Sequence, residues 1–310
     1  MSVYGIPYQG SKSSIAEEII ASLPSGNRLV DLFGGGFAIS HCGLYSYKYK
    51  QVLYNDINPL LVPLIKDCIA GKYNYSHFKP EWISKEEFYN KKDSDGFIKL
   101  VWSFGNDGNT YIYGAETAEI KRQGHDFCVN GTPIPSFGYL NLESEIPDIK
   151  GRRLELIQSC QVELDENPEN PDAEKLQTLM HCEHLERIER MQKLENLHRQ
   201  DRLQFSCMDY REYKYQDGDV VYCDIPYQNN YAKKANDYGQ QFDSGAFYAW
   251  AIQQPFPVYF SSYSLGGIVW ESEKRLLMDS NGDPRYRREV LYCVDDNYKT
   301  PNTPIANTLF

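Results

Sequence analysis

Short runs of β-forming residues alternate with helical segments along much of this sequence, and this alternation restricts the fold more than any other feature. The strand-like runs lie at 27–33, 51–56, 202–207, 219–223, 257–262, 288–294 and at the C-terminus. The helical segments between them lie at 12–23, 59–70 and 246–254. This order is typical of a doubly wound α/β fold, in which ligands bind at the carboxyl ends of the strands. We predict a Rossmann-like, mostly parallel, seven-stranded sheet.

Residues 71–201 interrupt this alternation with glycine-rich turns, proline-punctuated loops and a long charged segment. We therefore predict a catalytic domain built from residues 1–70 and 202–310, with residues 71–201 as an inserted lobe. Within residues 174–200 of the lobe, apolar side chains recur at every third position. The spacing predicts a long helix that bends or makes contacts on successive sides, because a straight helix has 3.6 residues per turn.

The charge distribution bears on the choice of partner. A net charge of −11 argues mildly against a nucleic-acid partner, because phosphate binding relies on lysine and arginine. Much of the acidity, however, lies in residues 163–174. The basic residues gather in short groups at 121–123, 151–153, 273–275 and 285–288. A local basic face is therefore compatible with the overall charge.

Other features narrow the class of protein. The hydrophobic content of 41% is enough for a substantial core, and no apolar run is long enough for a membrane span. The N-terminus does not read as a secretory signal, so we expect a cytoplasmic protein without a membrane partner. The eight cysteines include no C-x-x-C pair, which indicates reduced thiols. His181, Cys182 and His184 have no second pair of ligands nearby, and we predict no metal.

The first strand-like run ends in the glycine-rich turn "DLFGGGFA", which would let a ligand approach the backbone closely before the next helix. The second run ends at Asp56, where a carboxylate can accept hydrogen bonds from ribose hydroxyls. This pair indicates a nucleoside-containing cofactor. The turn lacks the G-x-G-x-x-G spacing of dinucleotide sites, so S-adenosylmethionine fits better than a nicotinamide cofactor.

The segments "IPYQGSK", "DLFGGGFA", "YNDIN", "FSCMDY" and "VVYCDIPY" follow one another along the chain. In this order they resemble the motifs of the Dam-like N6-adenine DNA methyltransferases. The resemblance covers both ends of the chain and leaves the central residues poorly matched. It implies an S-adenosylmethionine-dependent enzyme that acts on double-stranded DNA, and we expect a monomer.

The resemblance assigns roles to individual residues. The cofactor-binding positions are Tyr8, Lys12, Asp31, Phe33, Gly34, Gly36, Asp56, Asp209, Tyr210 and Asp224. The catalytic D-P-P-Y motif is matched by Asp224, Ile225, Pro226 and Tyr227. The family pattern has proline where this chain has Ile225.

The chemistry of an exocyclic amine explains why such a motif is needed. The nitrogen lone pair is delocalised into the ring, so an enzyme must fix both N–H groups and turn the lone pair toward the methyl donor. The Asp224 carboxylate and the Ile225 carbonyl would supply two acceptors, and Tyr227 a stacking face. Pro226 still favours an extended Ile225, so we expect the substitution to be tolerated. The target base must flip out of the duplex to reach such a pocket.

Aromatic and amide side chains in the lobe, with cations nearby, are typical of DNA recognition through base edges and phosphates. The same aromatic residues would equally form the core of a small hairpin. The residues predicted to contact DNA are Trp102, Asn106, Asn109, Tyr111, Tyr113, Lys121, Arg122 and Tyr231.

We therefore predict a site-specific DNA adenine N6-methyltransferase. Methylation of N4 of cytosine or of an RNA amine is an alternative, because the same geometry serves any exocyclic amine. A catalytically silent module that binds a nucleoside and DNA is a second alternative, suggested by Ile225 and by the acidic charge.

Overall fold

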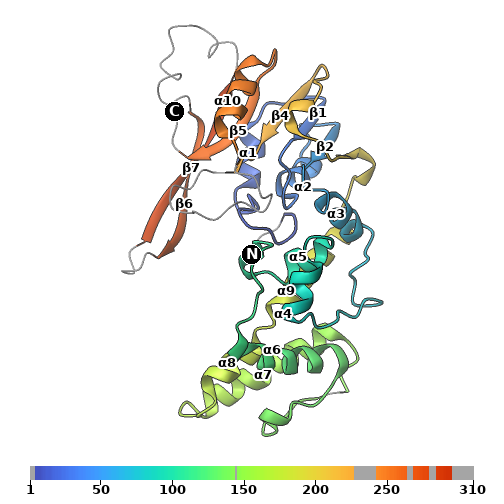
Figure 1. The fold of residues 1–310 in the computed structure, drawn as a ribbon, viewed down its shortest axis with the longest axis vertical. Helices are drawn as coiled ribbons and strands as arrows, with labels where there is room; N and C mark the ends of the chain where they lie inside the picture. The colour runs from blue at the N-terminus through green and yellow to red at the C-terminus, as the bar shows by residue number, and fades with distance from the viewer. Residues whose placement is uncertain (1–3, 144, 227–241, 264–267, 279–283, 295–310) are drawn as a thin grey trace. The chain divides into compact units, whose positions relative to one another are not determined.

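The structure is a computed structural model of the chain. The residues that it describes are 4–143, 145–226, 242–263, 268–278 and 284–294. Contacts within the chain divide it into two units, each of which is described by itself (Figure 1). The sheet unit comprises Met1–Ile6, Gly10–Ile65 and Leu197–Phe310, and the helical unit comprises Pro7–Gln9 and Lys66–Asn196.

A single mixed sheet forms the centre of the sheet unit, with its strands in the order β3-β2-β1-β4-β5-β7-β6. The strands from β3 to β5 are parallel, and β7 runs antiparallel to both β5 and β6. The bounds are β1 (Arg28–Asp31), β2 (Gln51–Asn55), β3 (Leu203–Ser206), β4 (Asp219–Cys223), β5 (Val258–Tyr263), β6 (Ile268–Met278) and β7 (Pro284–Val294). The predicted α/β class with a mostly parallel sheet is confirmed.

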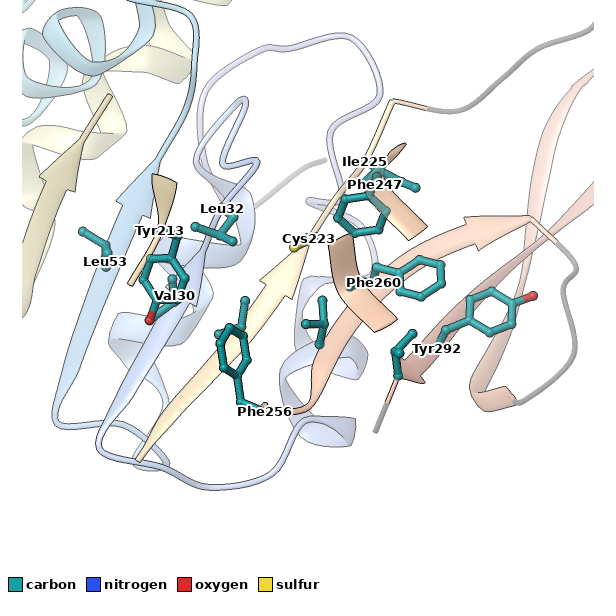
Figure 2. Packing of buried hydrophobic residues seen from close by; sticks show 14 residues of the cluster. Val30, Leu32, Leu53, Tyr213, Cys223, Ile225, Phe247, Phe256, Phe260 and Tyr292 are labelled. Carbon is teal, nitrogen blue, oxygen red and sulfur yellow. The ribbon is translucent and has the colours of Figure 1, made fainter. Parts of the chain in front are cut away.

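The central strands are apolar because helices cover the sheet on both faces, as parallel sheets require. All four residues of β1 and the last four of β4 are buried. The helices of this unit are α1 (Ala16–Ser22), α2 (Ala38–Tyr45) and α10 (Ser244–Gln253), and α3 (Leu61–Ile69) begins here. The ring of Phe247 in α10 lies 5.8 Å from the Phe33 ring and 5.7 Å from the Phe260 ring. Figure 2 shows Phe247 and Phe260 within the core cluster.

An ion pair joins the amino ends of β1 and β4. The Arg28 guanidinium donates two hydrogen bonds to the Asp219 carboxylate, from Nε at 2.9 Å and from a terminal nitrogen at 2.8 Å. The hydroxyl of Tyr213 donates to the same carboxylate. Both charged groups are largely buried, and a paired, hydrogen-bonded geometry is what makes such burial tolerable. The clamp fixes the register of two strands that are far apart in sequence.

The helical unit contains no strand among its described residues, and its longer helices pack as a small bundle (Figure 1). In it, α6 packs against α7 and α8. The helices are α4 (Lys85–Lys91), α5 (Gly96–Val101), α6 (Ala115–Asn130), α7 (Ile149–Glu166), α8 (Ala173–Met180) and α9 (Glu183–Gln192).

The single long helix predicted for residues 174–200 is wrong, because the chain breaks between α8 and α9. His181 is extended, with φ −105° and ψ 90°. The apolar period of three residues cannot stay on one face of a straight helix, and two shorter helices each bury their own apolar residues. Lys121 stabilises the break, because its buried ammonium donates to the carbonyl of His181 and pairs with Glu183 at 2.9 Å.

Two histidines meet in the core of the helical unit. His125 Nδ1 lies 2.9 Å from His184 Nε2, and the Tyr113 hydroxyl lies 2.6 Å from His184 Nδ1. The indole ring of Trp102 stacks on His184 with 4.3 Å between ring centroids. Burial lowers the pKa of His125 to about 4, and burial, followed by the charge of His125, lowers the pKa of His184 well below its ordinary value. Both rings are therefore neutral at neutral pH.

We expect acidification to destabilise the helical unit. The folded-state pKa of each histidine lies below the unfolded value of about 6.5, so the unfolded chain binds protons first as the pH falls. From pH 7.5 to 5.5, protonation of His125 in the unfolded chain should lower the free energy of unfolding by about 1 kcal/mol, and His184 should act in the same direction. Urea unfolding followed by tryptophan fluorescence at both pH values measures this loss. His125→Gln should lose about 1 kcal/mol less than wild type, and an equal loss in both proteins would contradict the expectation.

Candidate active site

The strand order reverses between β1 and β4, and this switch point is where doubly wound sheets bind ligands. Asp31, the last residue of β1, is in register with Tyr222 of β4. Asp224 follows the end of β4 directly. The predicted cofactor turn after β1 and the predicted catalytic motif after β4 are therefore neighbours at one edge of the sheet.

The glycine turn after β1 lies tightly against the end of β2. The Gly34 N–H donates to the carbonyl of Asn55 at 2.8 Å, and the Tyr54 hydroxyl donates to the carbonyl of Gly35 at 2.8 Å. The Gly35 N–H donates to Asp56 Oδ2, also at 2.8 Å. A Cβ atom on Gly34 would lie 2.2 Å from the Tyr54 ring. Glycine is therefore needed at this position for the turn to reach β2.

The N-terminal segment packs onto the same turn. The Ile6 N–H donates to the carbonyl of Gly36 at 2.8 Å, and a Cβ on Gly5 would lie 2.2 Å from that oxygen. The Gly5 N–H donates to His41 Nδ1 at 3.0 Å. Because this nitrogen accepts, the imidazole is neutral, and burial lowers the pKa of His41 to about 4. These contacts anchor the segment that leads to Lys12.

Lys12 contacts the first residue of the predicted catalytic motif. Its buried ammonium lies 2.6 Å from Asp224 Oδ1, and the carboxylate of Asp224 is partly exposed. This ion pair joins a residue predicted to lie beside the cofactor to the first residue of the predicted catalytic motif.

Asp31 is fully buried beside this pair. Its Oδ2 accepts hydrogen bonds from the N–H of Ser40 at 3.1 Å and from the Ser40 hydroxyl at 2.8 Å. Its Oδ1 has no hydrogen-bond partner among the described residues. Burial raises the pKa of Asp31 to about 7 against the lowering effect of Ser40, and the negative charges of Asp224 and Asp56 add to the rise. The site therefore favours a ligand that brings positive charge.

Asp56 braces the turn. Oδ2 accepts from the Gly35 N–H, and Oδ1 accepts from the N–H of Asn58 at 2.8 Å. Each carboxylate oxygen has a second lone pair, so these bonds are compatible with the predicted ribose contact. The structural role of Asp56 was missed by the sequence analysis, as were those of His41 and Ser40, because no motif or spacing marks them.

Partly exposed aromatic rings lie beside the turn. The Phe33 ring lies 5.4 Å from that of Tyr210, and Tyr210 lies 5.0 Å from Trp250. Asp209 is held by Arg211, which donates from its backbone N–H at 2.9 Å and from Nε at 2.8 Å. The hydrogen bonds from Arg211 hold the pKa of Asp209 below its usual range. Rings of this kind provide an apolar surface on which a planar base can stack.

The substituted position of the predicted catalytic motif is a core position. The Ile225 side chain is only 3% exposed and belongs to the cluster that contains Cys223, Phe247 and Phe260 (Figure 2). Pro226 follows and is partly exposed. Tyr227 and Tyr231 lie outside the described residues, and Tyr8 groups with the helical unit.

Four of the predicted DNA contacts are wrong, because the structure buries them in the core of the helical unit. These residues are Trp102, Tyr111, Tyr113 and Lys121. The alternative interpretation of a small hairpin explains the aromatic residues, since Ser103 and Tyr111 form an antiparallel bridge. Alternating aromatic and polar residues are equally typical of a hairpin core and of a recognition surface.

The remaining lobe residues of that prediction are accessible. Asn109 and Arg122 are exposed, and Asn106 is partly exposed. Arg122 pairs with Glu119 at 2.8 Å and with Asp126 at 3.1 Å, and its contact with DNA stays a prediction.

Two other features are absent from the described part of the chain. It holds no group of three or more histidine, cysteine or acidic side chains that could bind a metal ion. None of its helices is long and apolar enough to cross a membrane.

A doubly wound sheet with an acidic, glycine-lined switch point is typical of α/β proteins that bind a nucleoside ligand. Residues 8–120 match the family model described as D12 class N6 adenine-specific DNA methyltransferase. The match supports the resemblance to Dam-like adenine methyltransferases and indicates a DNA adenine methyltransferase, which is a transferase. It covers the glycine turn and Asp56 and ends before Asp224. No curated protein matches the chain.

We expect Gly34→Ala to disrupt the turn, because its Cβ would overlap the Tyr54 ring and one of the two must move. The substitution should weaken binding of the nucleoside ligand at least tenfold, a loss of about 1.4 kcal/mol or more. Isothermal titration calorimetry measures the affinity. Gly114→Ala is a matched control, because its Cβ meets only Thr117 at 3.9 Å and its φ is −68°. Equal affinities of the two variants would show that the turn tolerates a side chain.

Proposed function

We propose that this chain is a site-specific methyltransferase that transfers a methyl group from S-adenosylmethionine to N6 of a flipped adenine in duplex DNA. The observation that carries the proposal is the convergence of the glycine turn, Lys12 and Asp224 at the switch point of the sheet. The match of residues 8–120 supports adenine as the target.

The residues at the switch point fit the proposed cofactor. S-adenosylmethionine, when bound, supplies a methyl group on a positively charged sulfur. The acidic surroundings of Asp31 favour such a cation, and Asp31 Oδ1 is an acceptor without a partner among the described residues. Asp56 is proposed to hold the ribose, and the rings of Phe33 and Tyr210 to contact the adenine. Asp209 is proposed to flank that adenine, and Tyr8 to lie beside the cofactor.

The motif after β4 is proposed to position the target amine. The Asp224 carboxylate accepts one N–H of the amine and the Ile225 carbonyl accepts the other, which turns the nitrogen lone pair toward the methyl group. Lys12 fixes Asp224 Oδ1 in place. Pro226 keeps the preceding residue extended, and Tyr227 stacks on the base. The rate gain comes mainly from positioning and from stabilisation of charge that develops on nitrogen.

We propose that the two units have different roles. The sheet unit is proposed to be the catalytic domain, with the seven-stranded fold of S-adenosylmethionine-dependent methyltransferases, and the helical unit to be the lobe that recognises the target sequence. Asn106, Asn109 and Arg122 of the helical unit, which are exposed or partly exposed, are the lobe side chains still proposed to contact DNA. We propose that the protein acts as a monomer in the cytoplasm.

The decisive test is transfer of labelled methyl from S-adenosylmethionine to unmethylated duplex DNA. Wild type should form N6-methyladenine, and Asp224→Asn, which keeps the shape of the side chain but removes its charge, should lower kcat at least a hundredfold, about 2.7 kcal/mol in the barrier. Mass spectrometry of the nucleosides identifies the product. N4-methylcytosine or methylated RNA would select the alternative enzyme classes. Cofactor binding without transfer to DNA or RNA would select the silent binding module.

We expect affinity for S-adenosylmethionine to rise with pH. A cationic ligand prefers the ionised form of Asp31, whose pKa in the free protein is raised to about 7. Between pH 6.0 and 7.5 the ionised fraction grows about eightfold, and the affinity should follow it. Calorimetric titration of wild type and Asp31→Asn over this range measures the change. The variant should bind weakly with little pH dependence, and parallel curves for both proteins would assign the dependence to another group.

A further inference from the structure

The four basic groups of the sequence differ in the partners that the structure gives them. In the helical unit, Lys121 pairs with Glu183, and Arg122 pairs with Glu119 and Asp126. The arginines of the second group, at 151–153, also form hydrogen bonds and ion pairs within the protein. Arg152 donates to the carbonyls of Cys128 at 2.8 Å and Val129 at 3.0 Å, and Arg153 pairs with Glu189 at 2.7 Å. The cations of these two groups therefore already have acidic or carbonyl partners within the protein.

The two remaining groups, 273–275 and 285–288, lie on neighbouring strands. The register of β6 and β7 places Lys274 opposite Arg287, and places Leu276 opposite Arg285. Because alternate residues of a strand share a face, these four residues lie on one face of the two-stranded ribbon. The other face carries Glu273 opposite Arg288 and Arg275 opposite Tyr286. One face therefore gathers three cations, with Glu289, opposite Ser272, as the next residue on that face after Arg287.

This arrangement is unfavourable for the ribbon alone. Like charges directly opposite one another destabilise a strand pair, and Lys274 opposite Arg287 is such a pair. A two-stranded ribbon is itself only marginally stable. A polyanion bound to this face would remove the repulsion.

The ribbon lies at the edge of the sheet that carries the candidate active site. β7 pairs with β5 only from Val258–Val294 to Tyr263–Glu289, and β5 is parallel to β4. Tyr263 is therefore at the carboxyl end of the sheet, the same edge as Asp31 and Asp224. Residues 284–288 of β7 run beyond it with their partners on β6, by about 17 Å at roughly 3.4 Å per residue. Figure 1 shows this ribbon extending past the rest of the sheet.

We propose that the ribbon formed by residues 272–278 and 284–289 is a DNA-binding arm, whose face with Lys274, Arg285 and Arg287 contacts the phosphates of the duplex that carries the target base. The inference rests on the proposed function. Phosphate contacts fix the position of a protein on DNA without reading its sequence, and the major groove admits a two-stranded ribbon. In a chain with a net charge of −11, DNA binding requires such a local concentration of cations.

The test compares two variants that remove the same charge from opposite edges of one sheet. Arg285→Gln with Arg287→Gln removes two cations from the arm. Lys50→Gln with Arg202→Gln removes two that directly precede β2 and β3, at the amino edge. Affinity for a short duplex of arbitrary sequence is measured by fluorescence anisotropy over a range of salt concentrations, together with KM for DNA and the affinity for S-adenosylmethionine.

The arm variant should bind the duplex at least tenfold more weakly, and the slope of log affinity against log salt should fall by about 1.8, which corresponds to two lost phosphate contacts. The loss should appear in KM for DNA, with the affinity for S-adenosylmethionine unchanged. The amino-edge variant should match wild type. Equal slopes and equal KM values for the two variants would overturn the proposal.

The outcomes separate this proposal from the proposed function. Methyl transfer by wild type with an arm variant that behaves like the amino-edge variant would reject the arm and keep the enzyme. A reduced salt slope in the arm variant, without methyl transfer by wild type, would keep the arm and reject the enzyme. If the arm variant melts at a lower temperature than wild type, Lys274→Gln, which relieves the repulsion on the other strand, replaces it and should lower the slope by about 0.9.

Discussion

The parallel pairing of β1 with β4 is the contact on which the candidate site depends. Arg28 and Asp219, 191 residues apart in sequence, clamp the amino ends of the two strands. The opposite ends then place Asp31 and Asp224 at the switch point. The chain between them leaves through β2 and returns through β3, which are themselves paired. A large insertion there adds little closure entropy, because that cost grows only with the logarithm of loop length.

The electrostatics of the site follow from burying carboxylates close together. Hydrogen bonds from two backbone N–H groups stabilise the carboxylate of Asp56, and the ammonium of Lys12 stabilises that of Asp224. The carboxylate of Asp31 accepts hydrogen bonds on Oδ2 only, from Ser40, and its Oδ1 has no partner among the described residues. A purely structural carboxylate this deep would have both oxygens satisfied, because an unpaired buried acceptor costs about 1–3 kcal/mol. A buried carboxylate with one unsatisfied oxygen beside a glycine turn is typical of a site that binds a ligand.

The sequence predicted those parts of the fold that depend on local pattern. Strand-like runs and glycine-rich turns are local, so the parallel core and the ordered motifs were predictable, and strand neighbours then followed from the α/β class. The break at His181 was not predictable, because it depends on Lys121, a residue far away in sequence that satisfies the freed carbonyl. The anchoring of the N-terminal segment by His41 and the bracing of the glycine turn by Asp56 were missed for the same reason, because both act through contacts that no spacing records.

Aromatic and basic residues were the least predictable, because their types fit a core and a nucleic-acid surface equally well. A core and a nucleic-acid surface differ in whether neighbouring residues provide partners for the charged and aromatic side chains. On a helix, acids three or four residues away can neutralise a cation, as Glu119 and Asp126 do for Arg122. On a ribbon, the nearest neighbours are cross-strand, and for Lys274 that neighbour is Arg287. A chain with a net negative charge can therefore keep a locally positive surface where strand register, rather than composition, brings its cations together.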